Sequence, residues 1–153
     1  MSSGHRDSRV DVRVSVPDTV VNQASVESRL RILLAEDEPQ IRNLLARVLA
    51  REGWDVTAVN DGRQAVAAWP PEGHSYDLII MDVNMPDMDG YEASCHLKRL
   101  HPQAEFLFIS GHLDQPLCRK LVQMGFELVP KPFSPQQFAH RVSERLRQSV
   151  KSE

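Results

Sequence analysis

The stretch LIIMD at Leu78–Asp82 decides the fold, because four consecutive apolar residues end at a single carboxylate. A continuous apolar run of this length is typical of a strand covered on both faces, as in a parallel sheet flanked by helices. Turn-forming residues follow in NMPDMDG at Asn84–Gly90, and a helix-like segment then runs over Tyr91–Leu100 before Pro102. The stretch therefore predicts a buried strand, a loop and a helix in succession.

The same unit recurs on both sides of this stretch. Apolar runs such as Ile32–Ala35 and Phe106–Ile109 end at polar residues and are followed by segments with helical periodicity. We expect strands at residues 32–35, 54–59, 78–81, 106–109 and 127–129, and helices at 41–49, 65–69, 91–100, 116–124 and 135–146. Strict alternation with short connections predicts an α/β fold, with a five-stranded parallel sheet, helices on both faces and right-handed crossovers.

The composition is that of a globular protein, with 153 residues, 41% of them hydrophobic and 25% charged. A net charge of −3 gives no broad attraction to nucleic acid or to an anionic membrane, so we expect neither as a partner. Cys95 and Cys118 lack zinc-binding spacing and are expected to be reduced thiols. No apolar run approaches the ~20 residues of a membrane span, and the N-terminus does not resemble a secretory signal. We therefore expect a cytoplasmic protein.

The regular pattern indicates one domain over residues 29–148, followed by a short C-terminal tail at 149–153. Residues 1–28 are mostly polar, although four valines within Val10–Val16 alternate with other residues as in a half-buried strand. A lone strand cannot bury its apolar face by itself, which favours a mobile tail or linker remnant. The alternative is the last strand and linker of a preceding domain.

Five chemically active residues follow successive predicted strands: Glu36, Asp37, Asp82, Ser110 and Lys131. In open parallel sheets the functional site lies beyond the carboxyl ends of the strands. Taken singly, each residue could serve a turn, a helix cap or a solvated loop. Their common position at one edge of the sheet instead indicates a single site.

Three carboxylates at this edge would repel one another without a cation. Hard oxygen ligands favour Mg²⁺, which takes one or two carboxylates and is completed by water or phosphate oxygens. An aspartate held beside such an ion can attack phosphorus and form an aspartyl-phosphate. Lys131 and Ser110 would then supply a cation and a hydroxyl donor for the phosphoryl oxygens.

Together these motifs resemble the response-regulator receiver family of two-component signalling. The resemblance rests on the acidic pair Glu36-Asp37, the stretch MDVNMPDMDG at Met81–Gly90, the sequence Ile109–Gly111, and KPF at Lys131–Phe133, and it covers about residues 30–146. It implies the (βα)5 flavodoxin-like receiver fold. It also implies a phosphoryl donor, either a histidine kinase or a histidine phosphotransfer protein, and a downstream protein target.

The resemblance also implies roles around the metal. Asp82 would be the phosphoacceptor, and Asp37 and Asp82 would bind Mg²⁺ directly. Glu36 would act through water, and the backbone carbonyl of Asn84 would complete the protein's share of the ligands.

Around the phosphoryl group, Ser110 is similar to the family's switch hydroxyl and Lys131 to its phosphate-pairing lysine. Gly111, without a side chain, would leave the acceptor open to a donor. His112 could lean over the site and affect the phosphoryl lifetime, or could be a solvated loop residue.

The chain departs from the family pattern at Leu128, where many members have an aromatic residue that changes rotamer on activation. In this region it resembles receivers fused to hybrid sensor kinases, and the sequence leaves open whether the domain is stand-alone or part of such a kinase. Two other functions stay open: an aspartate-nucleophile phosphatase of haloacid-dehalogenase type, and a non-phosphorylated pseudo-receiver. The first needs a second carboxylate two residues after the nucleophile, where this chain has Asn84. The intact acidic pair, acceptor, hydroxyl and lysine argue against the second.

Overall fold

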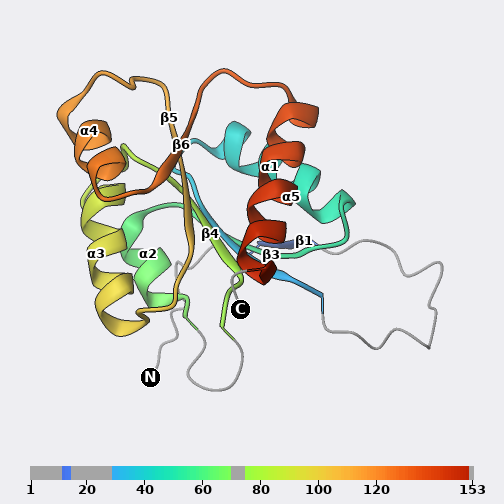
Figure 1. Cartoon of the computed structure of the whole chain (residues 1–153). Helices are drawn as coiled ribbons and strands as arrows, with labels where there is room; N and C mark the ends of the chain where they lie inside the picture. Colours follow the sequence, from blue (N-terminus) through green and yellow to red (C-terminus); the bar gives the residue numbers. More distant parts are fainter. Residues whose placement is uncertain (1–11, 15–28, 70–74, 152–153) are drawn as a thin grey trace, which may run out of the picture.

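The computed structural model describes residues 12–14, 29–69 and 75–151, which form a sheet with helices on both of its faces (Figure 1). The strands are β1 (Val12–Val14), β2 (Arg31–Ala35), β3 (Asp55–Val59), β4 (Leu78–Asp82), β5 (Phe106–Ser110) and β6 (Glu127–Pro130). The helices are α1 (Pro39–Arg51), α2 (Gly62–Ala67), α3 (Gly90–Leu100), α4 (Pro116–Gln123) and α5 (Pro135–Lys151).

The strand order is β1-β3-β2-β4-β5-β6, and the five strands β2 to β6 are parallel. This confirms the predicted parallel sheet and its flanking helices. The order changes direction between β2 and β4, so the loops after these two strands diverge on opposite sides of the sheet. That divergence opens space at their carboxyl ends, which is where such folds place a site.

Alternating residues of β4 enter two separate cores, because successive side chains of a strand point to opposite faces. Ile79 and Met81 pack with residues of α2, α3 and α4, whereas Leu78 and Ile80 pack with residues of α1 and α5. Figure 1 shows the same division of the helices. All four side chains are fully buried, and each such burial contributes about 1.5–3 kcal/mol, so β4 is firmly anchored and fixes the position of Asp82.

The start of α3 is held tightly against the end of β4. An added Cβ at Gly90 would lie 2.6 Å from the carbonyl oxygen of Asp82, so a larger residue would force the helix away. Asp89 caps the helix by accepting a hydrogen bond from the Glu92 amide at 2.8 Å. The loop between Asp82 and α3 is therefore fixed at both ends.

Two elements differ from the sequence-based expectations. The strand Val12–Val14 pairs antiparallel with β3, with Val12 opposite Ala58 and Val14 opposite Val56. It extends the same sheet as an edge strand, because it satisfies the edge hydrogen-bonding groups of β3, while the expected domain bounds stay a prediction. The remainder of the predicted N-terminal segment, residues 1–11 and 15–28, lies outside the described residues.

Helix boundaries also shift. α2 begins at Gly62, before the expected start at residue 65, because the Asp61 carboxylate accepts the Gln64 amide hydrogen bond and caps the helix. α5 continues to Lys151, beyond the expected domain end at 148. Within the described residues, no helix combines the length and the apolar character required to cross a membrane.

Candidate functional site

Three carboxylates converge at the carboxyl ends of β2 and β4. Glu36 and Asp37 directly follow β2, and Asp82 is the last residue of the neighbouring parallel strand β4. One oxygen from each of the three lies within 4.8 Å of the others. Glu36 is fully buried and Asp82 is only 4% exposed. The structure thus brings together the three acidic residues that the sequence analysis placed at this edge.

Glu36 has the most strongly perturbed carboxyl group of the site. Burial, reinforced by the negative charge of Asp82, raises its pKa from 4.5 to about 8. The Glu38 amide donates a hydrogen bond to Glu36 Oε2 at 3.1 Å, which opposes this rise. The other oxygen, Oε1, is buried, and none of the described residues donates a hydrogen bond to it. A buried oxygen in this state has free capacity for a cation or a bound water.

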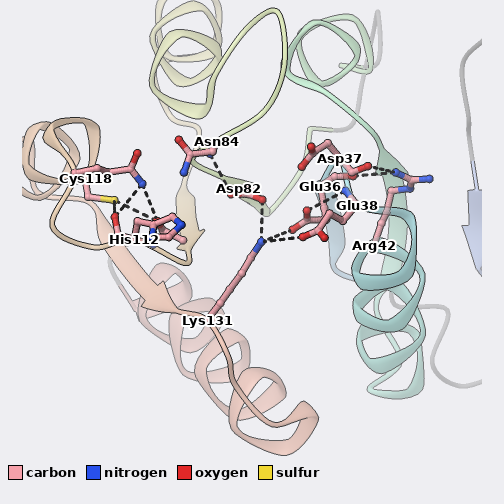
Figure 2. Close-up of polar contacts among 11 residues, drawn as sticks. Glu36, Asp37, Glu38, Arg42, Asp82, Asn84, His112, Cys118 and Lys131 are labelled. Atoms are coloured by element: carbon pink, nitrogen blue, oxygen red, sulfur yellow. Dashed lines mark hydrogen bonds and ion pairs between the residues drawn. The ribbon is translucent and has the colours of Figure 1, made fainter.

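Lys131 lies just beyond β6 and acts as the local counter-ion. Its Nζ donates a hydrogen bond to Asp82 Oδ2 at 3.0 Å and forms an ion pair with Glu36 Oε1 at 3.3 Å. Figure 2 shows its side chain extending between Asp82 and the acidic residues after β2. Burial alone would lower the pKa of Lys131, but the hydrogen bond and charge of Asp82, together with Glu36, raise it above its ordinary value. The ammonium group is therefore firmly protonated.

Asn84 lies two residues beyond Asp82, and its backbone amide donates a hydrogen bond to Asp82 Oδ1 at 3.1 Å. Both carboxylate oxygens of Asp82 are thus engaged, one by Asn84 and the other by Lys131. The Asn84 main chain therefore lies beside the Asp82 carboxylate. That its carbonyl serves as a metal ligand stays a prediction.

Ser110 ends β5 at the same edge of the sheet and is fully buried. Its hydroxyl oxygen accepts hydrogen bonds from the His112 amide and from Gln115 Nε2, both at 3.1 Å. The Lys131 backbone amide donates to the Ser110 carbonyl oxygen at 2.8 Å, but within the described part of the chain no hydrogen bond joins the Ser110 hydroxyl to the side chain of Asp82 or Lys131. The predicted switch hydroxyl is thus present but bonded to its own loop.

The surface beside this loop is open. A Cβ added to Gly111 would meet no atom of the described residues within 4 Å, and access for a donor at this point stays a prediction. The His112 side chain is exposed, and the contacts of His112 within the site are made by its main chain.

Arg42 on α1 is a residue of the site that the sequence analysis did not identify. It is only 8% exposed, and its Nη1 donates to the carbonyl oxygens of Glu36 at 3.0 Å and Asp37 at 3.5 Å. It therefore fixes the backbone of the acidic loop and places a positive charge behind it. In the sequence, Arg42 is only an arginine that follows Ile41, a residue of the apolar stripe of a helix. Periodicity alone does not distinguish a buried arginine at such a position from one exposed to solvent.

The site combines a buried cluster of acidic oxygens, a lysine and a nearby hydroxyl at the switch point of a parallel sheet. The chain belongs to the family described as response regulator receiver domain, whose model matches residues 32–143. This identifies the family anticipated from the strand-end motifs.

Particular relatives include both short and long proteins. The chain is 33% identical over 138 residues to the sensor kinase CckA of Brucella abortus, covering 89% of this chain and 15% of that protein. It is 32% identical over 122 residues to the chemotaxis protein CheY of Bacillus subtilis, covering 78% of this chain and 97% of that one. It spans half of the transcriptional regulatory protein YbdJ of Bacillus subtilis at 34% identity. The match to longer proteins therefore concerns one domain of each.

The fold agrees with solved receiver structures. A CheY-like response regulator receiver domain protein from Methanospirillum hungatei superimposes with a TM-score of 0.75 at 23% identity, covering 82% of this chain and all of that one. Since the identity is low, this likeness establishes the fold alone.

Proposed function

We propose that this domain accepts a phosphoryl group on Asp82 from the phosphohistidine of a histidine kinase or phosphotransfer protein, in a reaction that requires Mg²⁺. The observation that carries the proposal is the convergence of buried Asp82 and Glu36 with partly exposed Asp37 and Lys131 in one site. Family membership supports the same function.

The donor set fits a magnesium ion. Asp37, Asp82 and the Asn84 carbonyl would bind it directly and Glu36 through water. This agrees with the buried Glu36 Oε1, which accepts no hydrogen bond from the residues that the structure describes. When bound, the ion would neutralise charge on the phosphoryl oxygens and on the attacking carboxylate. Arg42 would keep the acidic loop in position through the two carbonyl oxygens that it contacts.

Asp82 would act as the nucleophile. One of its carboxylate oxygens forms a bond to phosphorus while the bond from phosphorus to the donor's imidazole nitrogen breaks, and the donor leaves with that electron pair. Lys131 already donates to Asp82 Oδ2, so a small movement would bring its ammonium group to a phosphoryl oxygen. Ser110 would provide the hydroxyl donor after leaving its present partners. In this proposal the domain catalyses only its own phosphorylation and the later loss of the phosphoryl group.

The phosphatase alternative lacks its proton donor. The residue two positions after Asp82 is Asn84, which contacts Asp82 through its backbone amide and offers no carboxyl group. We therefore expect no rapid turnover of free phosphate esters. The partners implied are a kinase or phosphotransfer protein and a downstream protein. The receiver unit, expected at residues 29–148 and extended at its sheet edge by Val12–Val14, would act in the cytoplasm and needs neither nucleic acid nor membrane.

Incubation with Mg²⁺ and acetyl phosphate, followed by intact mass measurement, tests the proposal. We expect one added phosphoryl group that requires Mg²⁺ and is absent from Asp82→Asn. Continuous release of phosphate would instead favour a phosphatase. No reaction in the presence of both reagents and of a phosphorylated donor protein would favour the pseudo-receiver.

A further inference from the structure

The Ser110 hydroxyl is surrounded by partners from its own loop and from α4. A hydroxyl oxygen has two lone pairs and one proton to offer. The His112 amide and the Gln115 side-chain amide both donate to this oxygen at 3.1 Å, and the buried Cys118 thiol, a weak donor, is shared between the same oxygen at 3.4 Å and the His112 carbonyl oxygen at 3.3 Å. Figure 2 shows Cys118 and His112 side by side, apart from Lys131. Since Ser110 is fully buried, it has no access to water that could replace a lost partner.

Gln115 is placed unusually for this task. It is the N-cap residue of α4, where Ser, Thr, Asp and Asn are preferred because their side chains accept hydrogen bonds from the helix. In the described part of the chain, the Gln115 side chain makes no such bond. Its Nε2 instead bridges back to the Ser110 oxygen at 3.1 Å and to the His112 carbonyl oxygen at 2.9 Å. A favourable local cap is therefore replaced by a bond that closes the loop onto Ser110.

We propose that Gln115 is a positioning residue that holds the Ser110 hydroxyl in the unphosphorylated arrangement and thereby sets how readily the domain changes to the phosphoryl-bound one. This inference rests on the proposed function, in which Ser110 donates to a phosphoryl oxygen on Asp82. Such a movement breaks the bond from Gln115. The Gln115 side-chain amide therefore stabilises the resting state and not the phosphoryl-bound state. Removing this amide shifts the equilibrium toward the phosphoryl-bound state.

The substitution Gln115→Met tests this role, because methionine keeps the length of the side chain but has no N–H to donate. The probe is beryllofluoride with Mg²⁺, a stable mimic of the phosphoryl group on an aspartate, titrated by amide NMR. Loss of one neutral hydrogen bond should tighten the apparent Kd about three- to tenfold. Gln123→Met, an exposed substitution of the same kind at the end of α4, is the matched control and should leave the Kd unchanged.

A Ser110→Ala background separates a specific bond from a general loosening of the loop. Without the hydroxyl, Gln115→Met should leave the Kd unchanged, since the bond it removes no longer exists. A second readout needs no phosphoryl mimic: in the free protein, the His112 amide, which donates to Ser110, should exchange its hydrogen faster in Gln115→Met than in wild type.

The outcomes separate the two proposals. The role of Gln115 would be overturned, with phosphorylation left intact, if Gln115→Met had an unchanged or larger Kd for beryllofluoride. It would also be overturned if Gln115→Met changed the Kd by the same factor in the Ser110→Ala background as in the wild type. A wild-type protein that does not bind beryllofluoride would overturn the proposed function and with it the positioning role.

Discussion

Replacement of Glu36 by glutamine should stabilise the metal-free domain at pH 8, because the folded protein holds this carboxyl in an unfavourable place for a charge. Taken alone, the rise of its pKa from 4.5 to about 8 corresponds to about 5 kcal/mol, at about 1.4 kcal/mol per pKa unit. Relaxation around the charge reduces the penalty, so we expect a gain of about 2–4 kcal/mol in Glu36→Gln.

The sign of the pH dependence follows from the direction of the shift. Below about pH 4.5 the carboxyl of Glu36 is protonated in both the folded and the unfolded chain, and it contributes nothing. Between pH 4.5 and about 8 the unfolded chain releases the proton while the folded chain retains it, so the stability of the wild type falls through this window. Glu36→Gln has no such proton, and its advantage should grow from about pH 5 to pH 8.

Urea unfolding with EDTA present, at half-unit steps from pH 5 to pH 8.5, measures this difference. Glu52→Gln changes an exposed glutamate at the end of α1 and is the matched control. Mg²⁺ should oppose the loss of wild-type stability with rising pH, because the cation and the proton compete for the carboxylate oxygens. A hundredfold excess of Mg²⁺ over Kd should add about 2.7 kcal/mol to the unfolding free energy of the wild type. Parallel stability profiles of wild type and Glu36→Gln across this range would refute the reasoning.

Four further predictions concern the acceptor, its partners and the output. Asp82→Asn should keep the fold but lose all phosphorylation, and peptide mapping of the wild type that placed the phosphate on another residue would contradict the assignment. Lys131→Ala should retain Mg²⁺-dependent stabilisation in thermal melts but react slowly with acetyl phosphate, since the Lys131 ammonium group is proposed to contact the phosphoryl group and not the metal. Loss of the stabilisation by Mg²⁺ in this variant would contradict this division of roles. Arg42→Met should lower stability by about 1–3 kcal/mol and weaken Mg²⁺ binding, because the buried carbonyl oxygens that it contacts lose their donor; unchanged values in a magnesium titration would count against its role. In amide NMR, beryllofluoride should shift residues 110–117 and 128–131 most, and a response confined to the N-terminal segment would place the output elsewhere.

Most of the parallel sheet could be predicted from the sequence because its strands are buried on both faces. The runs Ile32–Ala35, Leu78–Met81 and Phe106–Ile109 are continuous apolar segments, and all three form central strands. The carboxyl ends of parallel strands share one edge, so the order of motifs along the chain also predicted that the three carboxylates and Lys131 lie together, although the Ser110 hydroxyl bonds to its own loop. That reasoning needed no knowledge of individual contacts.

What could not be predicted depends on contacts between distant parts of the chain. The alternating valines that include Val12 and Val14 indicate a strand, but nothing in them specifies β3 as its partner. Arg42 differs from a solvated arginine only through the two carbonyl oxygens that the folded loop presents to it. Gln115 resembles an ordinary loop glutamine until the turn after β5 brings its amide to Ser110.

Both groups proposed to bind the phosphoryl oxygens already have partners in the resting state. The Lys131 ammonium group is bonded to Asp82 Oδ2, and the Ser110 hydroxyl is bonded to the His112 and Gln115 amides. Phosphorylation would therefore exchange hydrogen bonds instead of simply adding them, and the net free energy of an exchange is small compared with that of each bond. Two states separated by a small free energy are what a reversible switch requires. It follows that single donors such as the Gln115 amide, although far weaker than the ionic contacts of the site, can decide which state is populated.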